Sequence, residues 1–460
     1  MSDPGTTSSP DLLAPFPSSL PAVERAARLP LGFRAGAATA GIKASGKPDL
    51  SVVASAHGPM SAAATFTTNR FPSAPVIMSR AHLASTAPDG KGGYGTITAL
   101  LSTSGCANAA TGAPGLADQR DLAHALATAL GTDPSMTLAV STGLIGTRLP
   151  VEKIAPAIAR LVADGLRADD AAFDAVSEAL RTTDNVAKAA TVRVGLPAAD
   201  GRTITVTVSG VAKGVGMIHP RMATMLTYVL TDAGVAPDAL HRMLRPAVAR
   251  TWNQLSVDGD TSTSDTVFLV ASGAAGAAPV VEGTSAWDAL ARAVEAVARS
   301  LAQQQAADGE GANSLITCQV SGATDDIEAR ALARAVVQSS LVKAAFHGRD
   351  PNWGRIADAL GNAQIADGVV LEMVGVAPDV ARARGGQRVD LDPSRVRIAI
   401  AGTEVFAGLP VPFDKGAVSA SMATEEVLVR VDVGLGSGTG EAFGCDLSEE
   451  YVIENSEYST

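Results

Sequence analysis

Short runs of apolar and β-branched residues recur along the chain and alternate with longer amphipathic stretches. Such residues in a row, or alternating with polar ones, are typical of a buried or half-buried strand. The runs that fit this pattern span residues 51–54, 96–101, 136–140, 203–208, 265–270 and 315–320. Over residues 191–211 the pattern predicts a β-hairpin that delivers the chain to Lys213.

Other stretches carry their apolar residues at helical spacing and predict amphipathic helices. They span residues 151–166, 286–304 and 325–342. Asp325, Asp326 and Glu328 suit the positive end of the last helix. Gly-rich residues 271–278 and 434–440 predict loops. Strands that alternate with helices, without a tandem repeat, indicate an α/β fold with mixed sheets and outer helices.

Composition limits the class of protein. With 460 residues, of which 46% are hydrophobic, the chain can form two or three ordinary domains or one large two-part unit. Aromatic residues make up only 4%, so the core has to be built from Ala, Val, Leu and Ile. A formal net charge of −11 argues against nucleic acid as a ligand, because phosphates need a basic face, and we attribute the charge to solubility.

Residue patterns that bind metals or direct export are absent from the sequence. Cys106, Cys318 and Cys445 form no CxxC pair, and the scattered histidines include no HExxH, so we expect reduced thiols and no metal. Residues 1–28 are rich in Ser, Pro and Ala, lack the features of a signal peptide and are expected to form a flexible extension. No uncharged apolar run reaches about 18 residues, so we expect no membrane span and a cytoplasmic protein.

One run near the middle carries more chemistry than the rest. Residues 213–226 read Lys-Gly-Val-Gly-Met-Ile-His-Pro-Arg-Met-Ala-Thr-Met-Leu, a Gly-rich loop that enters an apolar segment. A threonine hydroxyl needs a base to act as a nucleophile, and no His–Asp pair lies nearby. His219, between Ile218 and Pro220, is interpreted as a packed loop residue.

Further motifs follow in order to the C-terminus. They are Gly32-Phe33, residues 40–43, Asp49-Leu50, residues 66–71, 74–76, 104–112 and 141–143, Ile145-Gly146, and residues 182–184, 257–263, 309–312, 348–355 and 451–460. With the central run, they make the chain after about residue 30 resemble the ornithine acetyltransferase family, also called the glutamate N-acetyltransferases. So many long motifs in one order make the resemblance specific.

The resemblance implies that the chain cuts itself between Ala223 and Thr224. The new N-terminal Thr224 is then both nucleophile and base, because its Oγ attacks an acyl group and its α-amine, with an ordinary pKa of about 7.7–8.0, takes the proton. The cut divides the chain into an α chain, residues 29–223, and a β chain, residues 224–460. The implied fold is an αββα sandwich like that of N-terminal-nucleophile aminopeptidases, and the implied assembly is a heterotetramer with two of each piece.

The same resemblance supplies the other site residues. Thr111 and Gly112 match the family's oxyanion donors, a hydroxyl and a backbone N–H that stabilise negative charge on the acyl oxygen. The expected substrate-binding residues, besides Thr224, are Thr182 through its hydroxyl, Lys213 for a carboxylate, Glu310 for a distal ammonium, and Asn455 with Thr460 at the C-terminus.

Some positions depart from the family pattern and leave the amino-acid substrate open. They are Cys106, Ala110, Asn185, Arg221, Asn313 and Ser314. Residues 258–265 suggest a calcium loop but lack the Gly and Glu of an EF-hand, so we interpret them as a turn that organises the site. Residues 434–440 lack the strand and helix context of a dinucleotide site.

The implied activity is transfer of an acetyl group from N2-acetylornithine to glutamate through an acetyl-threonyl enzyme, in arginine biosynthesis and without a cofactor. Acetyl-CoA as an additional donor stays open. One alternative is an amidase or aminopeptidase of the related fold, with water as acceptor. The others are an acetyltransferase with a different amino-acid acceptor and an uncleaved relative that only binds.

Overall fold

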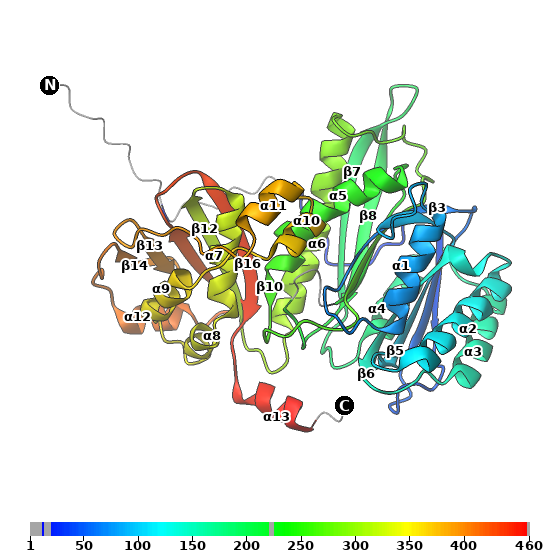
Figure 1. Cartoon of the computed structure of the whole chain (residues 1–460), viewed down its shortest axis with the longest axis horizontal. Helices are drawn as coiled ribbons and strands as arrows, with labels where there is room; N and C mark the ends of the chain where they lie inside the picture. Colours follow the sequence, from blue (N-terminus) through cyan, green and yellow to red (C-terminus); the bar gives the residue numbers. More distant parts are fainter. Residues whose placement is uncertain (1–11, 13–19, 220–224, 458–460) are drawn as a thin grey trace.

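The computed structural model describes residue 12, residues 20–219 and residues 225–457, and these form three β-sheets with surrounding helices (Figure 1). The first sheet has four strands in the order β1-β2-β5-β6. They are β1 (Phe33–Ala38), β2 (Leu50–Ser55), β5 (Ala99–Cys106) and β6 (Thr137–Leu144). β5 and β6 run parallel, whereas the other neighbours are antiparallel.

The second sheet has six strands in the order β4-β3-β11-β9-β8-β7. They are β3 (Met60–Phe66), β4 (Tyr94–Ile97), β7 (Lys188–Pro197), β8 (Thr203–Lys213), β9 (Leu226–Thr231) and β11 (Thr266–Ala271). β9 and β11 are parallel neighbours at the centre, between the antiparallel strands β8 and β3. Every residue of β9 is buried, as its sequence Leu-Thr-Tyr-Val-Leu-Thr allows in a sheet covered on both faces.

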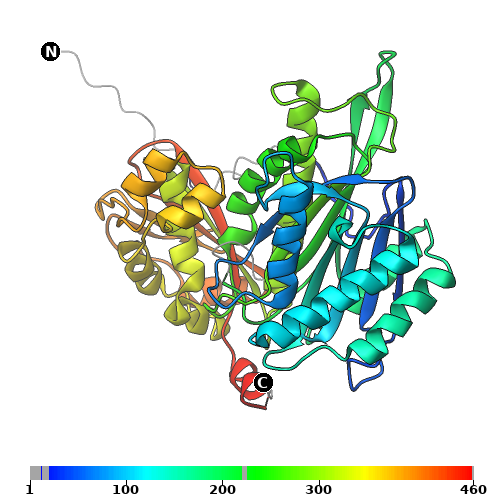
Figure 2. The ribbon, with the colours of Figure 1, turned by 45° about the vertical axis from the view of Figure 1, so that its right-hand side comes forward.

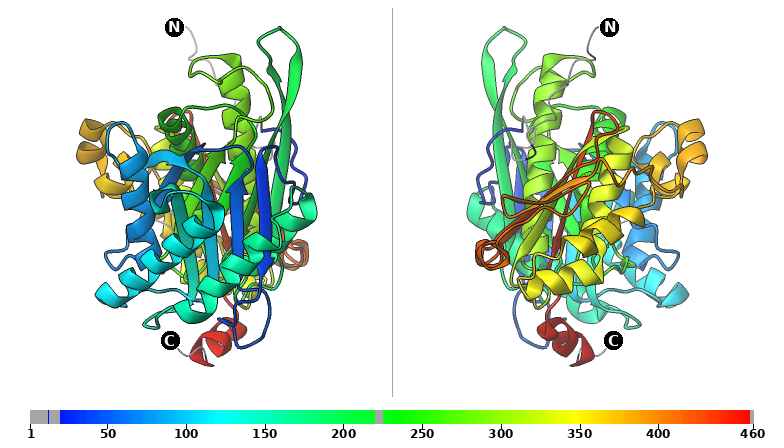
Figure 3. Two further views of the ribbon diagram at one scale, coloured as in Figure 1. Left: turned by 90° about the vertical axis from the view of Figure 1, so that its right-hand side faces the viewer. Right: turned by 90° about the vertical axis from the view of Figure 1, so that its left-hand side faces the viewer.

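These two sheets stack face to face, and helices cover their outer faces, whereas the helices over residues 74–86 and 170–180 also contribute to the core between the sheets. The helices of this part are α1 (Ala74–Thr86), α2 (Gly112–Leu130), α3 (Val151–Ala163), α4 (Asp170–Leu180), α5 (Pro237–Arg250) and α6 (Ser285–Ala307), with the short helices η1 (Pro134–Met136) and η2 (Trp252–Gln254). One core lies between the sheets, another joins the first sheet to α2 and α3, and a third joins the second sheet to α5 and α6 (Figure 3). The layers confirm the predicted αββα sandwich. Ala, Val, Leu and Ile supply most of the core, as composition predicted.

The third sheet forms the other side of the molecule with its own core (Figure 2). Its strand order is β10-β16-β12-β15-β13-β14. The strands are β10 (Leu255–Ser256), β12 (Leu315–Ala323), β13 (Arg397–Ile400), β14 (Thr403–Ala407), β15 (Glu426–Asp432) and β16 (Gly438–Cys445). The helices are α7 (Asp326–Gln338), α8 (Ser340–His347), α9 (Trp353–Gly361), α10 (Gly368–Met373), α11 (Pro378–Arg384), α12 (Lys415–Ser421) and α13 (Glu449–Glu457).

Two predicted elements are interrupted in the structure. The predicted strand 96–101 breaks at Thr98, because there the chain leaves the second sheet as β4 and enters the first as β5. The predicted helix 325–342 ends at Gln338. A new helix, α8, then begins, since Ser339 Oγ accepts a hydrogen bond of 3.3 Å from Val342 N and so caps it.

The predicted loop 434–440 is wrong at its end, since Gly438 and Gly440 belong to β16. A Cβ on Gly440 would lie 2.5 Å from the backbone N of Arg330 in α7. These glycines therefore serve close packing of a helix on a strand rather than a turn. The predicted hairpin and the helix over residues 151–166 match β7–β8 and α3.

The described part of the predicted N-terminal extension, residues 20–28, lies against the sandwich. Glu24 N donates a hydrogen bond of 2.9 Å to Thr191 O of β7, and Ala27 is buried. These contacts tie the segment to the edge of the second sheet.

Candidate active site

The segment between β8 and β9 is the centre of the candidate site. Ala223 and Thr224, predicted as cleavage site and nucleophile, lie outside the described residues. Met225 is buried, and its carbonyl oxygen accepts a hydrogen bond of 2.8 Å from Thr266 N of β11. The chain therefore enters the middle of the second sheet at Met225.

A small cavity of about 30 Å³ lies where β8 ends and β9 begins. Its lining residues are Thr142, Lys213, Gly214, Gly216, Met225, Leu226, Ser262, Ser264 and Asp265. Lys213 is half-buried, and its Nζ donates a hydrogen bond of 3.1 Å to Thr142 Oγ1 of β6. Burial lowers the pKa of Lys213, whereas the carboxylates of Asp184 and Glu310 favour its charged form. A desolvated ammonium at this place suits a ligand carboxylate.

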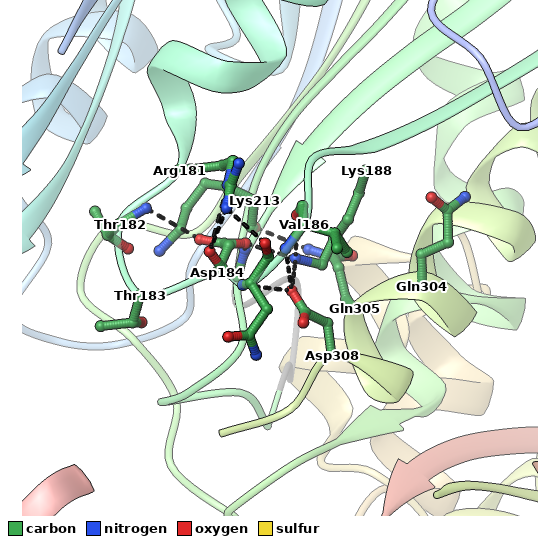
Figure 4. A network of polar contacts seen from close by, with 12 residues as sticks. Arg181, Thr182, Thr183, Asp184, Val186, Lys188, Lys213, Gln304, Gln305 and Asp308 are labelled. Carbon is green, nitrogen blue, oxygen red and sulfur yellow. Dashed lines mark hydrogen bonds and ion pairs between the residues drawn. The ribbon is translucent and has the colours of Figure 1, made fainter. Parts of the chain in front are cut away.

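Behind the cavity lies a buried ion-pair cluster that consists of Asp184, Lys188 and Asp308 (Figure 4). Lys188 Nζ lies 2.7 Å from Asp184 Oδ1 and 2.6 Å from Asp308 Oδ2. The three side chains are only 0%, 0% and 8% exposed, in the order Asp184, Lys188, Asp308. One lysine thus compensates two carboxylates away from water.

Asp184 of the cluster binds the backbone of two segments, one of which contains the cavity-lining residue Gly214. Asp184 Oδ2 accepts a hydrogen bond of 3.1 Å from Thr182 N, and Asp184 Oδ1 accepts one of 2.7 Å from Gly214 N. Burial alone would raise the pKa of Asp184, but Lys213 and Lys188 hold it well below its usual range. A permanently charged Asp184 therefore connects the predicted residues Thr182 and Lys213.

Glu310 is held by side chains from two other segments. Its Oε1 accepts a hydrogen bond of 3.0 Å from Thr183 Oγ1, and its Oε2 accepts one of 2.9 Å from Asn455 Nδ2 of α13. A Cβ on Gly216 would lie 2.1 Å from Glu310 Oε2, so the carboxylate packs against a position where only glycine fits. The sequence prediction named Thr182 for its hydroxyl, whereas the hydroxyl that contacts Glu310 is that of its neighbour Thr183.

The structure thus gathers four predicted substrate-binding residues into one region. They are Thr182, Lys213, Glu310 and Asn455. The other two, Thr224 and Thr460, lie outside the described residues.

The predicted oxyanion loop joins β5 to α2 and has unusual backbone geometry. Asn108, Ala110 and Gly112 have φ values of 48°, 56° and 61°, a region that non-glycine residues seldom adopt. Thr111 is right-handed and Gly112 left-handed, an alternation that turns successive N–H groups into one concavity. The loop also forms the N-terminus of the 19-residue helix α2, whose dipole favours negative charge there.

The hydroxyl of Thr111 already has a partner. It donates a hydrogen bond of 2.8 Å to Asn108 Oδ1, and Asn108 Nδ2 donates one of 2.9 Å to Gly115 O. Sequence reasoning assigned no role to Asn108. Within the described residues, no hydrogen bond joins Thr111 or Gly112 to the four residues gathered above.

Backbone hydrogen bonds link the oxyanion loop to the cavity wall instead. Ala74 N donates to Asn108 O at 3.0 Å, and the preceding Ser73 N donates to Thr263 O at 2.9 Å. Thr263 lies between Ser262 and Ser264, which line the cavity. The start of α1 therefore connects the oxyanion loop to the segment 262–264 in the cavity wall.

The loop ahead of the predicted cleavage position is fixed by residues 256–258. The Asp258 carboxylate accepts hydrogen bonds from Met217 N and Ile218 N, the latter at 2.9 Å, as expected for a turn that organises the site. His219 is buried with its Nδ1 2.9 Å from Ser256 Oγ, which agrees with a packed loop residue.

Gln305 of α6 is a further residue that the sequence did not reveal. Its Nε2 donates a hydrogen bond of 2.9 Å to Lys213 O, and its Oε1 accepts one of 3.0 Å from Trp252 Nε1. Both side chains are fully buried. They hold the backbone of Lys213 from the outer face of the second sheet.

Positions that depart from the family pattern contribute backbone contacts. Asn185 N donates to Asp308 Oδ2 at 3.1 Å, and Asn313 N and Ser314 N donate to Asp446 Oδ1 at 2.8 and 3.0 Å.

In the part of the chain that the structure describes, no cluster of three or more His, Cys, Asp or Glu could hold a metal ion. The helices of that part include none with the length and apolar character to cross a membrane.

Comparisons with known proteins add independent findings. The model of the ArgJ family matches residues 34–460. The Arginine biosynthesis bifunctional protein ArgJ of Thermus thermophilus is 43% identical over 435 residues, which cover 95% of this chain and 100% of the relative. The protein of the same name from Deinococcus radiodurans is 41% identical and covers 94% of this chain and 97% of its own length.

Solved structures are also similar. A chain of ornithine acetyltransferase from Mycobacterium tuberculosis, complexed with ornithine, is 35% identical, covers 45% of this chain and 99% of its own length, and gives a TM-score of 0.38. A chain of the ArgJ protein from Bacillus halodurans is 33% identical, covers 50% of this chain and 98% of its own length, and gives a TM-score of 0.44.

Proposed function

The chain belongs to the ArgJ family, and we propose that it moves an acetyl group from N2-acetylornithine to glutamate through an acetyl ester on Thr224. The protein is an acetyltransferase of arginine biosynthesis, as its family membership establishes. What the proposal adds is the division of roles among the residues of the site.

The observation that carries the proposal is the pair of opposite charges on Lys213 and Glu310. Lys213 precedes the Gly-rich residues 214–216 and lines the cavity together with Met225, whereas Glu310 packs against Gly216 at the other end of that segment. N2-acetylornithine carries an α-carboxylate and a distal ammonium, which match these charges in sign. Glutamate shares the α-carboxylate, so one pocket can take donor and acceptor in turn.

In the first half-reaction, Thr224 Oγ attacks the acetyl carbonyl while the α-amine of Thr224 takes the proton. Gly112 N–H and the Thr111 hydroxyl, once rotated away from Asn108, donate to the developing oxyanion, and such donors contribute about 3–4 kcal/mol each. The C–N bond then breaks, the α-ammonium of Thr224 protonates the leaving amine, and ornithine departs. The product is an acetyl ester on Thr224.

In the second half-reaction, the α-amine of glutamate attacks this ester. Its proton passes to the α-amine of Thr224 and from there to the departing Oγ, which regenerates the free threonine. The product is N-acetylglutamate. The same oxyanion donors serve both steps, because each builds charge on the same acetyl oxygen.

The test follows a labelled acetyl group. With N2-[acetyl-¹⁴C]ornithine and glutamate, we expect label in N-acetylglutamate and little in acetate. Release of labelled acetate without acetylation of glutamate would overturn the proposal in favour of the amidase. A panel of other amino acids defines the acceptor range, which the departures at Asn185, Asn313 and Ser314 leave open.

We extend the proposal to acetyl-CoA as a second donor, to a cytoplasmic location, and to an assembly of two α and two β pieces. The word bifunctional in the names of the relatives supports the second donor. Acetylation of glutamate by acetyl-CoA and the mass of the native particle test these points.

Self-processing gives a prediction of its own. We expect the purified protein to run as fragments 1–223 and 224–460 on a denaturing gel, and the C-terminal fragment to begin Thr224-Met225 by N-terminal sequencing. The fragments should stay together in native conditions, because separation would expose the core of the second sheet. A single full-length band from fully active enzyme would exclude self-processing.

Glu310→Gln should weaken use of the donor while self-cleavage proceeds. Cleavage uses the chain's own peptide, whereas transfer also needs the distal ammonium held by the carboxylate between Thr183 and Asn455. A charge-assisted hydrogen bond of about 1.5–3 kcal/mol predicts a loss of about ten- to hundredfold in kcat/KM for N2-acetylornithine.

The matched control is Glu450→Gln, which removes an exposed carboxylate at the start of α13. It should leave kcat/KM unchanged. A donor without the distal amine should respond little to Glu310→Gln. Unchanged kcat/KM for N2-acetylornithine, or a block of processing instead, would show that Glu310 does not bind substrate.

A further inference from the structure

A second cavity, of about 360 Å³, lies outside the active site, between the sandwich and the third sheet. Its walls come from the end of α5, from η2, from one face of α7 and from the segment that contains α10 (Figure 1). This volume falls at the lower end of the range for small-molecule sites. The established acetyl transfer assigns no task to it.

The α7 face presents two arginines to the cavity. Arg330 and Arg334 are one helical turn apart and both line it. Like charges at this spacing destabilise a helix unless something compensates them. Arg334 Nη1 donates a hydrogen bond of 2.7 Å to Asn253 O of η2, which holds one guanidinium in place.

Arg330 is the less satisfied of the two. It is half-buried, and among the described residues its guanidinium has no hydrogen bond or ion pair. Burial lowers the pKa of Arg330, with Asp326 opposing the shift. Asp367 is the acidic lining residue, but its Oδ1 accepts a hydrogen bond of 3.0 Å from Val370 N as the cap of α10. The lining residues thus carry two positive charges, on Arg330 and Arg334, against one negative charge on Asp367.

Polar amides and an apolar wall complete the site. Gln254 lines the cavity and is only 7% exposed, and its Nε2 donates a hydrogen bond of 3.0 Å to Ala249 O, so this side chain shapes the wall and is not assigned a contact with the carboxylate. Ile327, Ile365 and Leu371 supply apolar surface beside the arginines. A guanidinium fork beside aliphatic side chains suits a ligand with a carboxylate head and a hydrocarbon body.

We propose that this cavity binds a small aliphatic carboxylate, with its head at Arg330 and Arg334 and its body against Ile365 and Leu371. The inference does not depend on the proposed roles of Thr224, Lys213 or Glu310. The proposed ligand of this cavity is therefore distinct from the substrates of the acetyl transfer.

Titration calorimetry with the full-length protein tests the proposal, with 4-methylpentanoate as probe and 4-methylpentanamide as its uncharged match. We expect saturable binding of the carboxylate and at least about tenfold weaker binding of the amide. Arg330→Gln should weaken carboxylate binding by about ten- to hundredfold, the loss expected for a charged hydrogen bond. Arg292→Gln, which removes an exposed charge on α6, should not change it.

Two further variants locate the ligand. Lys213→Met should leave 4-methylpentanoate binding intact, whereas Ala331→Leu, which fills part of the cavity wall, should weaken it. If Arg330→Gln does not unfold cooperatively, the affinity of Ala331→Leu for 4-methylpentanoate is the test instead. The proposal is overturned if the carboxylate does not bind, if carboxylate and amide bind equally, or if Lys213→Met alone removes binding.

Discussion

Replacing Thr224 by alanine should abolish both self-cleavage and acetyl transfer. In the proposed mechanism each reaction begins with attack by the same Oγ, once on the peptide bond after Ala223 and once on the donor. Removal of a nucleophile lowers kcat by about four or more orders of magnitude, because no other group can form the covalent intermediate. Intact-mass measurement of the purified variant should give one full-length chain, and the labelled-acetyl assay should give no transfer above background.

Thr224→Ser is the matched control. It keeps a hydroxyl and, after cleavage, an N-terminal amine, so it should retain part of each activity. Both variants should melt like the wild type, since the described ladders of β9 with β8 and β11 run from Leu226 to Thr231 and keep all their residues. Substantial transfer by the alanine variant would mean that another residue carries the acetyl group.

Lys188→Met should destabilise the fold by about 3–5 kcal/mol, the usual loss when one partner of a buried ion pair is removed. The substitution leaves Asp184 and Asp308 without their shared cation, in a place where side chains are at most 8% exposed. Activity should also fall, because Asp184 positions the backbone of Thr182 and Gly214. Urea titration followed by circular dichroism measures the loss of stability.

The pH dependence of this loss gives a second check. In the wild type the pKa of Asp184 is lower in the folded state than its ordinary value of 3.8 in the unfolded state. This difference stabilises the fold at pH values above 3.8, and the stabilisation is lost as the pH falls through the pKa of the folded state. In Lys188→Met the unpaired carboxylates bind protons more readily, so the gap to wild type should narrow toward pH 4.

Two controls distinguish the lost charge from a general effect of the substitution. Lys153→Met changes an exposed lysine of α3 and should alter stability by less than about 0.5 kcal/mol. Lys188→Met/Asp308→Asn should recover part of the loss, since it removes one of the uncompensated charges. Equal stability of Lys188→Met and wild type would mean that the cluster contributes nothing net.

The fold was predictable where local pattern and burial agree. The alternation of Thr with Ile and Val over residues 203–208 lies within β8, and the apolar run 265–270 overlaps β11. The hydrophobic pattern did not predict element boundaries that depend on tertiary contacts. Thr98 lies in an unbroken apolar stretch, and only the position of the neighbouring strands shows that the chain changes sheets there.

The site was predictable from sequence only as far as motif resemblance reaches. Glu310 and Asn455 are 145 residues apart, and no spacing rule predicts the hydrogen bond between them. Lys188 is a single charge at the start of an apolar strand, which by composition suggests a solvated strand end. Its role depends on Asp308, 120 residues later. Pairings at such separations exist only in the folded chain.

The interleaving of strands from both sides of the proposed cleavage position has a consequence for how the enzyme would mature. β9 and β11 lie between β3 and β8, so residues after the cut are paired on both sides with residues before it. The proposed cut also needs the loop at Thr111, which joins β5 of the first sheet to α2 and is linked through Ser73 and Ala74 to Thr263, near the start of β11. Proposed self-cleavage would then occur only in chains that have folded, without another protease, and the cut chain would record that folding irreversibly. In a cell extract, the ratio of cut to intact chain would count how many molecules ever reached the native state.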